Sequence, residues 1–176
     1  TPAAVRDALI TTLSPQNTRG IILDIRGNTG GAYSEVLKVA RMFIDGNPPK
    51  TLWIIRQEGK EPVSVQAQSP ALTTLPCVVL IDEKTSGAAE LLAASMSQTA
   101  RATLVGSMTA GGAVMKERVQ NPDGTSRLVQ VGDFLFPKTG KTGTDGVVPD
   151  IIAPKDASPE QVLELGKKIL AEGGTR

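Results

Sequence analysis

The sequence contains no histidine, and this absence excludes several classes of catalytic chemistry. Serine and cysteine hydrolases that use a histidine base are excluded, and so are most zinc sites. A hydrolase of this composition needs another general base, and lysine is the usual substitute. We therefore expect neither a metal ion nor an organic cofactor in this chain.

Cysteine and aromatic residues are also scarce. Cys77 is the only cysteine, so a disulfide within the chain is excluded. It lies in the apolar run 76–81, which predicts a buried strand and an inert thiol. Aromatic residues make up only 3% of the chain, so its core must be built from Val, Ile, Leu and Ala.

The chain also lacks strong charge and long hydrophobic runs. Its net charge is +1, and no basic stripe with interleaved aromatics is present, so we expect no nucleic-acid partner. No apolar run approaches the roughly 20 residues of a membrane-spanning helix. A length of 176 residues with 40% apolar and 21% charged residues predicts one globular domain over 1–176. Because the chain lacks an initiating Met and a signal peptide, we expect it to be a fragment of a longer protein.

Hydrophobic periodicity and turn residues predict the order of the elements. The predicted helices span 3–13, 34–44, 87–99 and 158–172. The predicted strands span 20–26, 51–56, 62–68, 77–82, 102–106, 114–119 and 127–136. Runs 20–26 and 77–82 are nearly continuous in apolar residues, which is typical of strands buried on both faces of a parallel sheet. The pattern predicts an α/β core with added β-hairpins around 58–60 and 121–124.

Two turns rich in small residues are the candidate site. Asn28 to Gly31 follows a predicted buried strand, and its paired glycines allow close approach of the backbone to another group. Thr85 to Glu90 lies between a second buried strand and a helix. Ser86 could act there as a nucleophile or as the N-cap of the helix. Since ligands bind beyond the carboxyl ends of strands in open α/β sheets, the two turns could face one pocket.

Five stretches occur in the order and near-spacing of a known family: 20–31, 85–90, 101–106, 109–112 and 146–150. On these motifs the sequence, over about residues 3 to 170, resembles the C-terminal processing, or tail-specific, serine peptidases. It also resembles the retinoid-binding relatives of that family.

The resemblance implies a crotonase-like (ClpP/crotonase-type) α/β core. It implies a peptidase of exported or misfolded polypeptides that acts near their C-termini, in the periplasm or another exported compartment. Polypeptide C-termini are the implied partners, and a homo-oligomer is a further expectation. The family's upstream PDZ domain and its strand before Ala3 are not in this sequence.

The family uses a Ser nucleophile, a Lys base and an assisting Gln. Counting from Glu90, the nucleophile position is Gly87. The Lys position, 25 residues later, is Gly112, and the Gln position is Lys116. The resemblance also implies an oxyanion hole, which we assign to the backbone at Gly30, Gly31 and Gly87.

These departures leave two interpretations. In the first, Ser86 is the nucleophile and Lys116 is the base. Lys116 can act as a base only if the pKa of its amine lies well below the usual ~10.4. Positions 112 and 116 of a strand face one side about 13 Å apart, at ~3.3 Å per residue. In the second, the domain has lost hydrolysis and binds a peptide or an apolar ligand, as the retinoid-binding relatives imply. An interaction module within a larger exported assembly is a further alternative.

Overall fold

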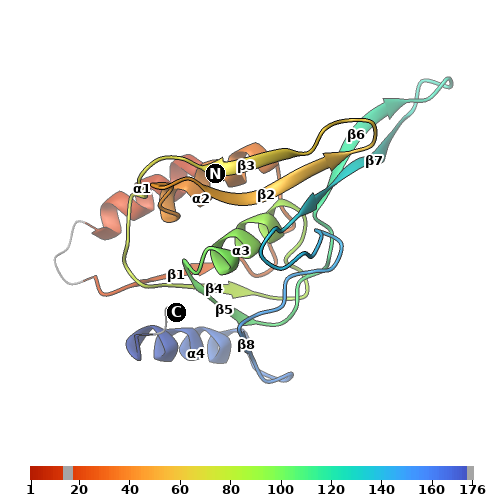
Figure 1. The fold of residues 1–176 in the computed structure, drawn as a ribbon. Coiled ribbons are helices and arrows are strands. Elements are labelled where there is room, and N and C mark those ends of the chain that lie inside the picture. The colour runs from red at the N-terminus through yellow and green to blue at the C-terminus, as the bar shows by residue number, and fades with distance from the viewer. Residues whose placement is uncertain (14–17, 174–176) are drawn as a thin grey trace.

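The computed structural model describes residues 1–13 and 18–173. Its helices are α1 (Pro2–Leu13), α2 (Tyr33–Phe43), α3 (Ala88–Gln98) and α4 (Pro159–Ala171) (Figure 1). Its strands are β1 (Ile21–Asp24), β2 (Lys50–Gln57), β3 (Val63–Ala67), β4 (Cys77–Ile81), β5 (Thr103–Gly106), β6 (Val114–Gln120), β7 (Ser126–Leu135) and β8 (Ile151–Ile152). The predicted α/β class is therefore confirmed.

Within the described residues, one sheet is parallel and has the order β1-β4-β5-β8. The expectation for β4 is confirmed, because every residue of that strand is buried. Burial raises the pKa of the Cys77 thiol to about 11, which fits an inert side chain. The parallel pairing expected for 20–26 is confirmed, and β1 packs on both faces, with Ile21 and Leu23 against one apolar cluster and Ile22 against the other. Burial is less complete than expected, because among the described residues β1 pairs with one strand only and its own residues are half-buried or exposed.

The second sheet is antiparallel, with the order β3-β2-β7-β6. Both predicted hairpins are confirmed, because β2 pairs with β3 and β6 pairs with β7. At the end of the second hairpin, Gly124 has a positive φ of 82°, and its N–H donates to the carbonyl of Asn121. Figure 1 shows this hairpin projecting from the rest of the domain.

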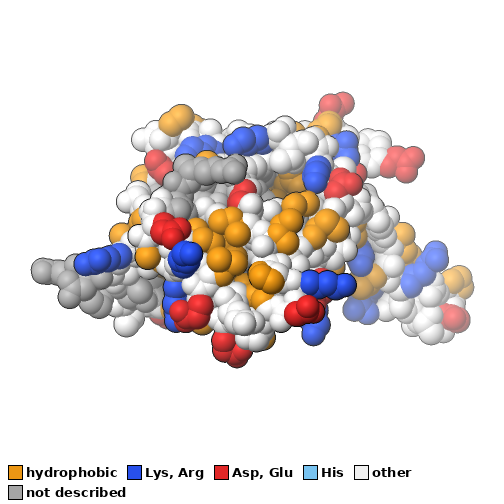
Figure 2. All heavy atoms as spheres, turned by 90° about the horizontal axis from the view of Figure 1, so that it is seen from below, with side chains coloured by type: hydrophobic (Ala, Val, Ile, Leu, Met, Phe, Trp, Pro, Cys, Tyr) orange, Lys and Arg blue, Asp and Glu red, His pale blue; other side chains and the backbone are white. Residues whose placement is uncertain are grey.

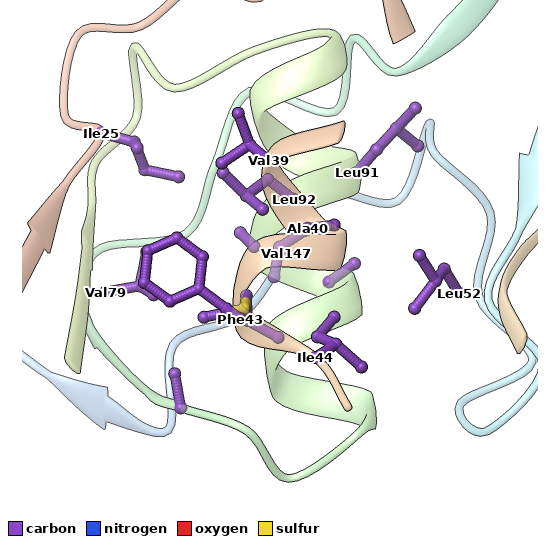
Figure 3. Close-up of a cluster of buried hydrophobic side chains, with 14 of the residues drawn as sticks. Ile25, Val39, Ala40, Phe43, Ile44, Leu52, Val79, Leu91, Leu92 and Val147 are labelled. Carbon is purple, nitrogen blue, oxygen red and sulfur yellow. The ribbon is translucent and has the colours of Figure 1, made fainter. Parts of the chain in front are cut away.

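Helix α3 occupies the space between the two sheets, and α4 covers the other side of the parallel sheet (Figure 1). All residues of α3 except Ser97 are buried, as expected for a helix made mostly of Ala, Leu and other small or apolar residues. Its Leu92 lies beside Val39 of α2, as Figure 3 shows, and both belong to the main apolar cluster. This packing fixes the N-terminus of α3, where the second candidate turn lies.

The C-terminal helix begins as predicted. The Ser158 hydroxyl accepts a hydrogen bond from the Gln161 N–H, and Gly173 follows the helix with a φ of 80°. Seen from the side of α4, hydrophobic side chains form a group bordered by charged ones (Figure 2). The short strand β8 was not predicted from the sequence, because two residues are too few for a periodic signal.

Candidate functional site

The two candidate turns are in direct contact. They follow β1 and β4, which are neighbouring parallel strands, so both leave the same edge of the sheet. The Ser86 N–H donates to the Asn28 carbonyl at 2.9 Å. A Cβ added to Gly30 would lie 2.7 Å from the Ala88 nitrogen, so the close approach of the two turns requires glycine at position 30.

The Asp82 side chain links the start of one turn to the start of the other through hydrogen bonds. Its Oδ1 accepts hydrogen bonds from the N–H groups of Gly27, Lys84 and Thr85 at 2.9, 3.1 and 2.8 Å. The hydroxyl of Thr85, a fully buried residue, lies 2.9 Å from the same oxygen. Burial acts to raise the pKa of Asp82, but these hydrogen bonds outweigh it and the pKa is lowered.

Replacing Asp82 by Asn is expected to destabilise the protein by about 2 kcal/mol at pH 7. Because the folded pKa lies below the unfolded value of about 3.8, this contribution is present above that value. It is lost as the pH falls through the folded pKa. Urea unfolding of the parent and of Asp82→Asn between pH 7 and pH 3 measures the difference. A difference that stays constant over this range contradicts the assignment.

Gly87 is the N-cap of α3, so the alternative that Ser86 caps this helix is wrong. Its φ of 59° and ψ of −129° are dihedrals that L-residues rarely adopt. A strained turn between a strand and a helix is the place where a nucleophile is presented in other hydrolase folds. Here the position carries no side chain, and an added Cβ would lie 3.2 Å from the Thr29 carbonyl oxygen.

Glu90 joins α3 to the turn at 109–112. The residue is fully buried, and four donors surround its carboxylate. Oε2 accepts from the N–H groups of Gly87 and Gly112 at 2.9 and 2.7 Å. Oε1 accepts from the Gly111 N–H at 2.7 Å and from the Thr109 hydroxyl. An ionised carboxylate can accept all four of these hydrogen bonds.

Gly112, the position predicted from the motif spacing to match the family's lysine, lies directly beside Ser86. A Cβ added to Gly112 would be 2.4 Å from Ser86 Oγ, far inside van der Waals contact. The partly buried Ser86 hydroxyl makes no hydrogen bond within residues 1–13 and 18–173. The two positions therefore share one small volume, and the hydroxyl of Ser86 occupies it.

Lys116 is not brought into contact with this group. It is exposed on β6 and pairs with Gln130 of β7. A register shift between Met115 and Lys116 interrupts the alternation of the strand, so positions 112 and 116 do not share a face by simple counting. No hydrogen bond or ion pair joins Lys116 to Ser86 in the described part of the chain, and the Ser86–Lys116 pair stays a prediction.

Of the three N–H groups expected to form the oxyanion hole, two already donate to acceptors within the protein. The Gly30 N–H donates to the Asn28 side chain at 2.9 Å, and the Gly87 N–H donates to Glu90. Across the described residues, the N–H groups of Gly31 and Ala88 have no partner. Sequence reasoning missed Ala88, although the residue after a nucleophile elbow supplies this donor in other hydrolase folds.

A family model described as peptidase family S41 matches residues 1–153. The chain belongs to peptidase family S41. The carboxyl-terminal-processing peptidase 3 of Arabidopsis thaliana, a chloroplastic protein, is 30% identical to this S41 domain over 151 residues. The alignment covers 86% of this chain and 29% of that protein. The carboxyl-terminal-processing protease of Synechocystis is 30% identical over 166 residues. That alignment covers 87% of this chain and 38% of the Synechocystis protein.

Solved structures share the fold of this S41 domain. The photosystem II D1 C-terminal processing protease matches with a TM-score of 0.74 at 28% identity, over 98% of this chain and 44% of that chain. A peptidase structure from Parabacteroides merdae matches in fold, with a TM-score of 0.78 at 17% identity, over 94% and 56%. This S41 domain spans about a third of the length of the curated relatives that it matches.

In the described part of this S41 domain, no group of three or more His, Cys, Asp or Glu residues is placed to hold a metal ion. No helix in that part of the chain is both long and apolar enough to cross a membrane.

Proposed function

We propose that this S41 domain, on a crotonase-like core, binds extended polypeptide segments and does not hydrolyse them. The observation that supports this most directly is Gly87. The backbone at this position has the strained dihedrals of a nucleophile turn, but it presents no hydroxyl. Gly112 likewise presents no amine at the family's lysine position.

The donors of the site fit a bound peptide carbonyl. Gly31 and Ala88 carry N–H groups without partners on two turns that touch each other. Such groups hold a carbonyl oxygen whether or not a nucleophile attacks its carbon. An extended segment bound in this way is the ligand class that the peptidase relatives' names imply for this domain. An apolar ligand is the alternative occupant of the same site.

Hydrolysis by Ser86 is a second candidate function. It is favoured by the Ser86 hydroxyl, which is partly buried beside Gly112 and makes no hydrogen bond in the described part of the chain. A general base must lie within hydrogen-bonding reach of the hydroxyl that it deprotonates. In this candidate Lys116 is the base, and substrate binding has to bring its amine to Ser86.

An unfolded reporter polypeptide with a fluorescent label separates the two functions. We expect the parent and Ser86→Ala to bind it equally and to leave it uncut after prolonged incubation. Mass spectrometry of the reporter measures cleavage, and fluorescence anisotropy measures binding. Ser34→Ala, at an exposed position of α2, is the matched control. Cleavage that is present in the parent and in Ser34→Ala but lost in Ser86→Ala would establish the second candidate.

The cellular setting is proposed from the relatives. Several of them are named as chloroplastic or are cyanobacterial C-terminal processing proteases. We place this protein in the periplasm or another exported compartment, where it meets segments near polypeptide C-termini. Cell fractionation tests the location. Light scattering of the purified protein tests whether it forms a homo-oligomer.

A further inference from the structure

The outer part of the hairpin formed by β6 and β7 is a ribbon of two strands. The strands pair regularly from Lys116 and Gln130 to Gln120 and Ser126. β7 begins to pair with β2 only at Gly132, so no third strand joins the ribbon among the described residues. Figure 1 shows the ribbon projecting from the rest of the domain. A two-stranded ribbon is only marginally stable in water, so a partner that covers one face stabilises it.

The strand pairing sorts the side chains of the ribbon onto two faces, because directly opposed residues of an antiparallel pair share a face. Glu117 lies opposite Val129, and Val119 lies opposite Arg127. We call the face formed by these four residues the valine face. Val119 is 39% exposed, and Val129 is half-buried. The opposite face is formed by Lys116, Arg118, Gln120, Ser126, Leu128 and Gln130.

The valine face carries one anion and one cation, and neither is paired. The side chains of Glu117 and Arg127 are exposed and make no hydrogen bond or ion pair within residues 1–13 and 18–173. Other charges of the hairpin are already engaged: Arg118 donates to Ser126 at 2.8 Å, and Asp123 accepts hydrogen bonds within the turn. The valine face therefore has the balanced charge that a surface needs to bind a copy of itself.

The four residues of the valine face lie at the corners of a square, with the valines on one diagonal and the charged residues on the other. A two-fold axis along the valine diagonal places each valine against the same valine of a second copy. The same axis places Glu117 against Arg127 of the second copy and Arg127 against its Glu117. An axis along the strands or across them would instead place every charged side chain against a valine.

We propose that the valine face binds the valine face of a second copy, with the two ribbons crossed at nearly a right angle. Orthogonal packing is one of the common arrangements of two sheets, and a two-fold interface must be complementary to itself. The proposal does not depend on the proposed function, because the valine face contains no residue of the two turns. Four residues from each copy are far fewer than the roughly 20–30 of a standard interface, so association is expected at high protein concentration.

The opposite face does not fit this arrangement, although its Leu128 is 62% exposed. Lys116 and Arg118 are the charged side chains of that face, and both are cations. A second copy placed on it would bring four cations together without an anion, which opposes association. The more exposed apolar residue of the ribbon is therefore predicted to lie outside the interface.

A thiol cross-link tests the position of the axis. Val119→Cys introduces a thiol that faces its own copy, and the native Cys77 does not compete because it is fully buried. Leu128→Cys is the matched control on the opposite face, at a position that is more exposed than Val119. Both variants are treated with a short bismaleimide at high protein concentration, and denaturing gels measure the dimer. We expect the Val119→Cys dimer to form about tenfold or more faster than the Leu128→Cys dimer.

Charge reversal tests the two ion pairs. Arg127→Glu replaces both pairs by contacts between carboxylates, and we expect it to weaken association about tenfold or more. The double variant Glu117→Arg with Arg127→Glu exchanges the charges, recreates both pairs and is expected to restore association. Arg118→Glu makes the same change of net charge on the opposite face and is expected to leave association unchanged. Sedimentation equilibrium measures association, and circular dichroism confirms that each variant is folded.

Each result either supports the crossed dimer or overturns it. Absence of association at every soluble concentration overturns the dimer, and so does association that Arg127→Glu leaves unchanged. Failure of the folded double variant to associate overturns the reciprocal ion pairs. Equal cross-linking rates at positions 119 and 128 overturn the axis. The proposed function is tested separately by the unfolded reporter and stands or falls with that measurement.

Discussion

Replacing Glu90 by Gln is expected to lower the free energy of unfolding by about 3–5 kcal/mol, although the two side chains have nearly the same shape. All four hydrogen bonds to Glu90 run from donors toward its oxygens. In either orientation of the glutamine amide, its NH₂ group takes the place of one carboxylate oxygen. The NH₂ group cannot accept the hydrogen bonds that the surrounding N–H groups donated to that oxygen. At least one buried N–H loses its acceptor, and the charge that strengthened the other bonds is removed.

Thermal or urea unfolding of the parent, Glu90→Gln and Glu90→Ala measures the effect. Ser95→Ala is the control, because Ser95 is a fully buried polar residue of the same helix. Its hydroxyl donates only to the Leu91 carbonyl, so we expect a loss of no more than about 1 kcal/mol. If Glu90→Gln costs no more than Ser95→Ala, the four-donor arrangement is not what stabilises this region.

Replacing Gly112 by Ala is expected to cost about 1–3 kcal/mol in the parent and little in the Ser86→Ala background. The reason is the 2.4 Å separation between the added Cβ and Ser86 Oγ. The next nearest atoms, the Gly87 nitrogen and Glu90 Oε2, are 3.6 and 3.7 Å away. Those are ordinary contacts, so the clash is confined to one hydroxyl.

A double-mutant cycle at positions 86 and 112 isolates this coupling. The four proteins are unfolded in urea, and the interaction free energy is obtained from their differences. We expect Ser86→Ala to recover most of the stability that Gly112→Ala loses. Gly140→Ala is a useful comparison, because its added Cβ meets no atom within 4 Å while its φ of 69° penalises a side chain. Additive costs at 86 and 112 would show that Ser86 does not restrict position 112.

Most of the fold could be predicted from the sequence because its signals are local. Continuous apolar runs mark β4 and β5, and the segment Asn121 to Gly124 contains residues that favour a turn, so the hairpin was found. β1 was harder, because an apolar run does not say whether a strand has one neighbour or two. β8 depends on pairing with β5 and on the Asp150 side chain accepting the Leu104 N–H, which are long-range contacts.

The site was predicted in outline and not in its contacts. The two turns could be found from their small residues, but three of the four donors to Glu90 come from residues about 20 positions further along the chain. Counting along a regular strand misplaces the face of Lys116, because the register shift between Met115 and Lys116 has no sequence signal of its own. Ser86 was a plausible cap by residue type, yet the chain places Gly87 at that position.

The contact between the two turns is made by main-chain atoms: the Ser86 N–H, the Asn28 carbonyl and the bare Cα of Gly30. Every residue except proline supplies the same N–H, so this contact does not depend on which side chain stands at 86. Evolutionary change at position 86 can therefore alter the chemistry of the site and leave its outline intact. In such a lineage the geometry of the site persists after its catalytic side chains have changed.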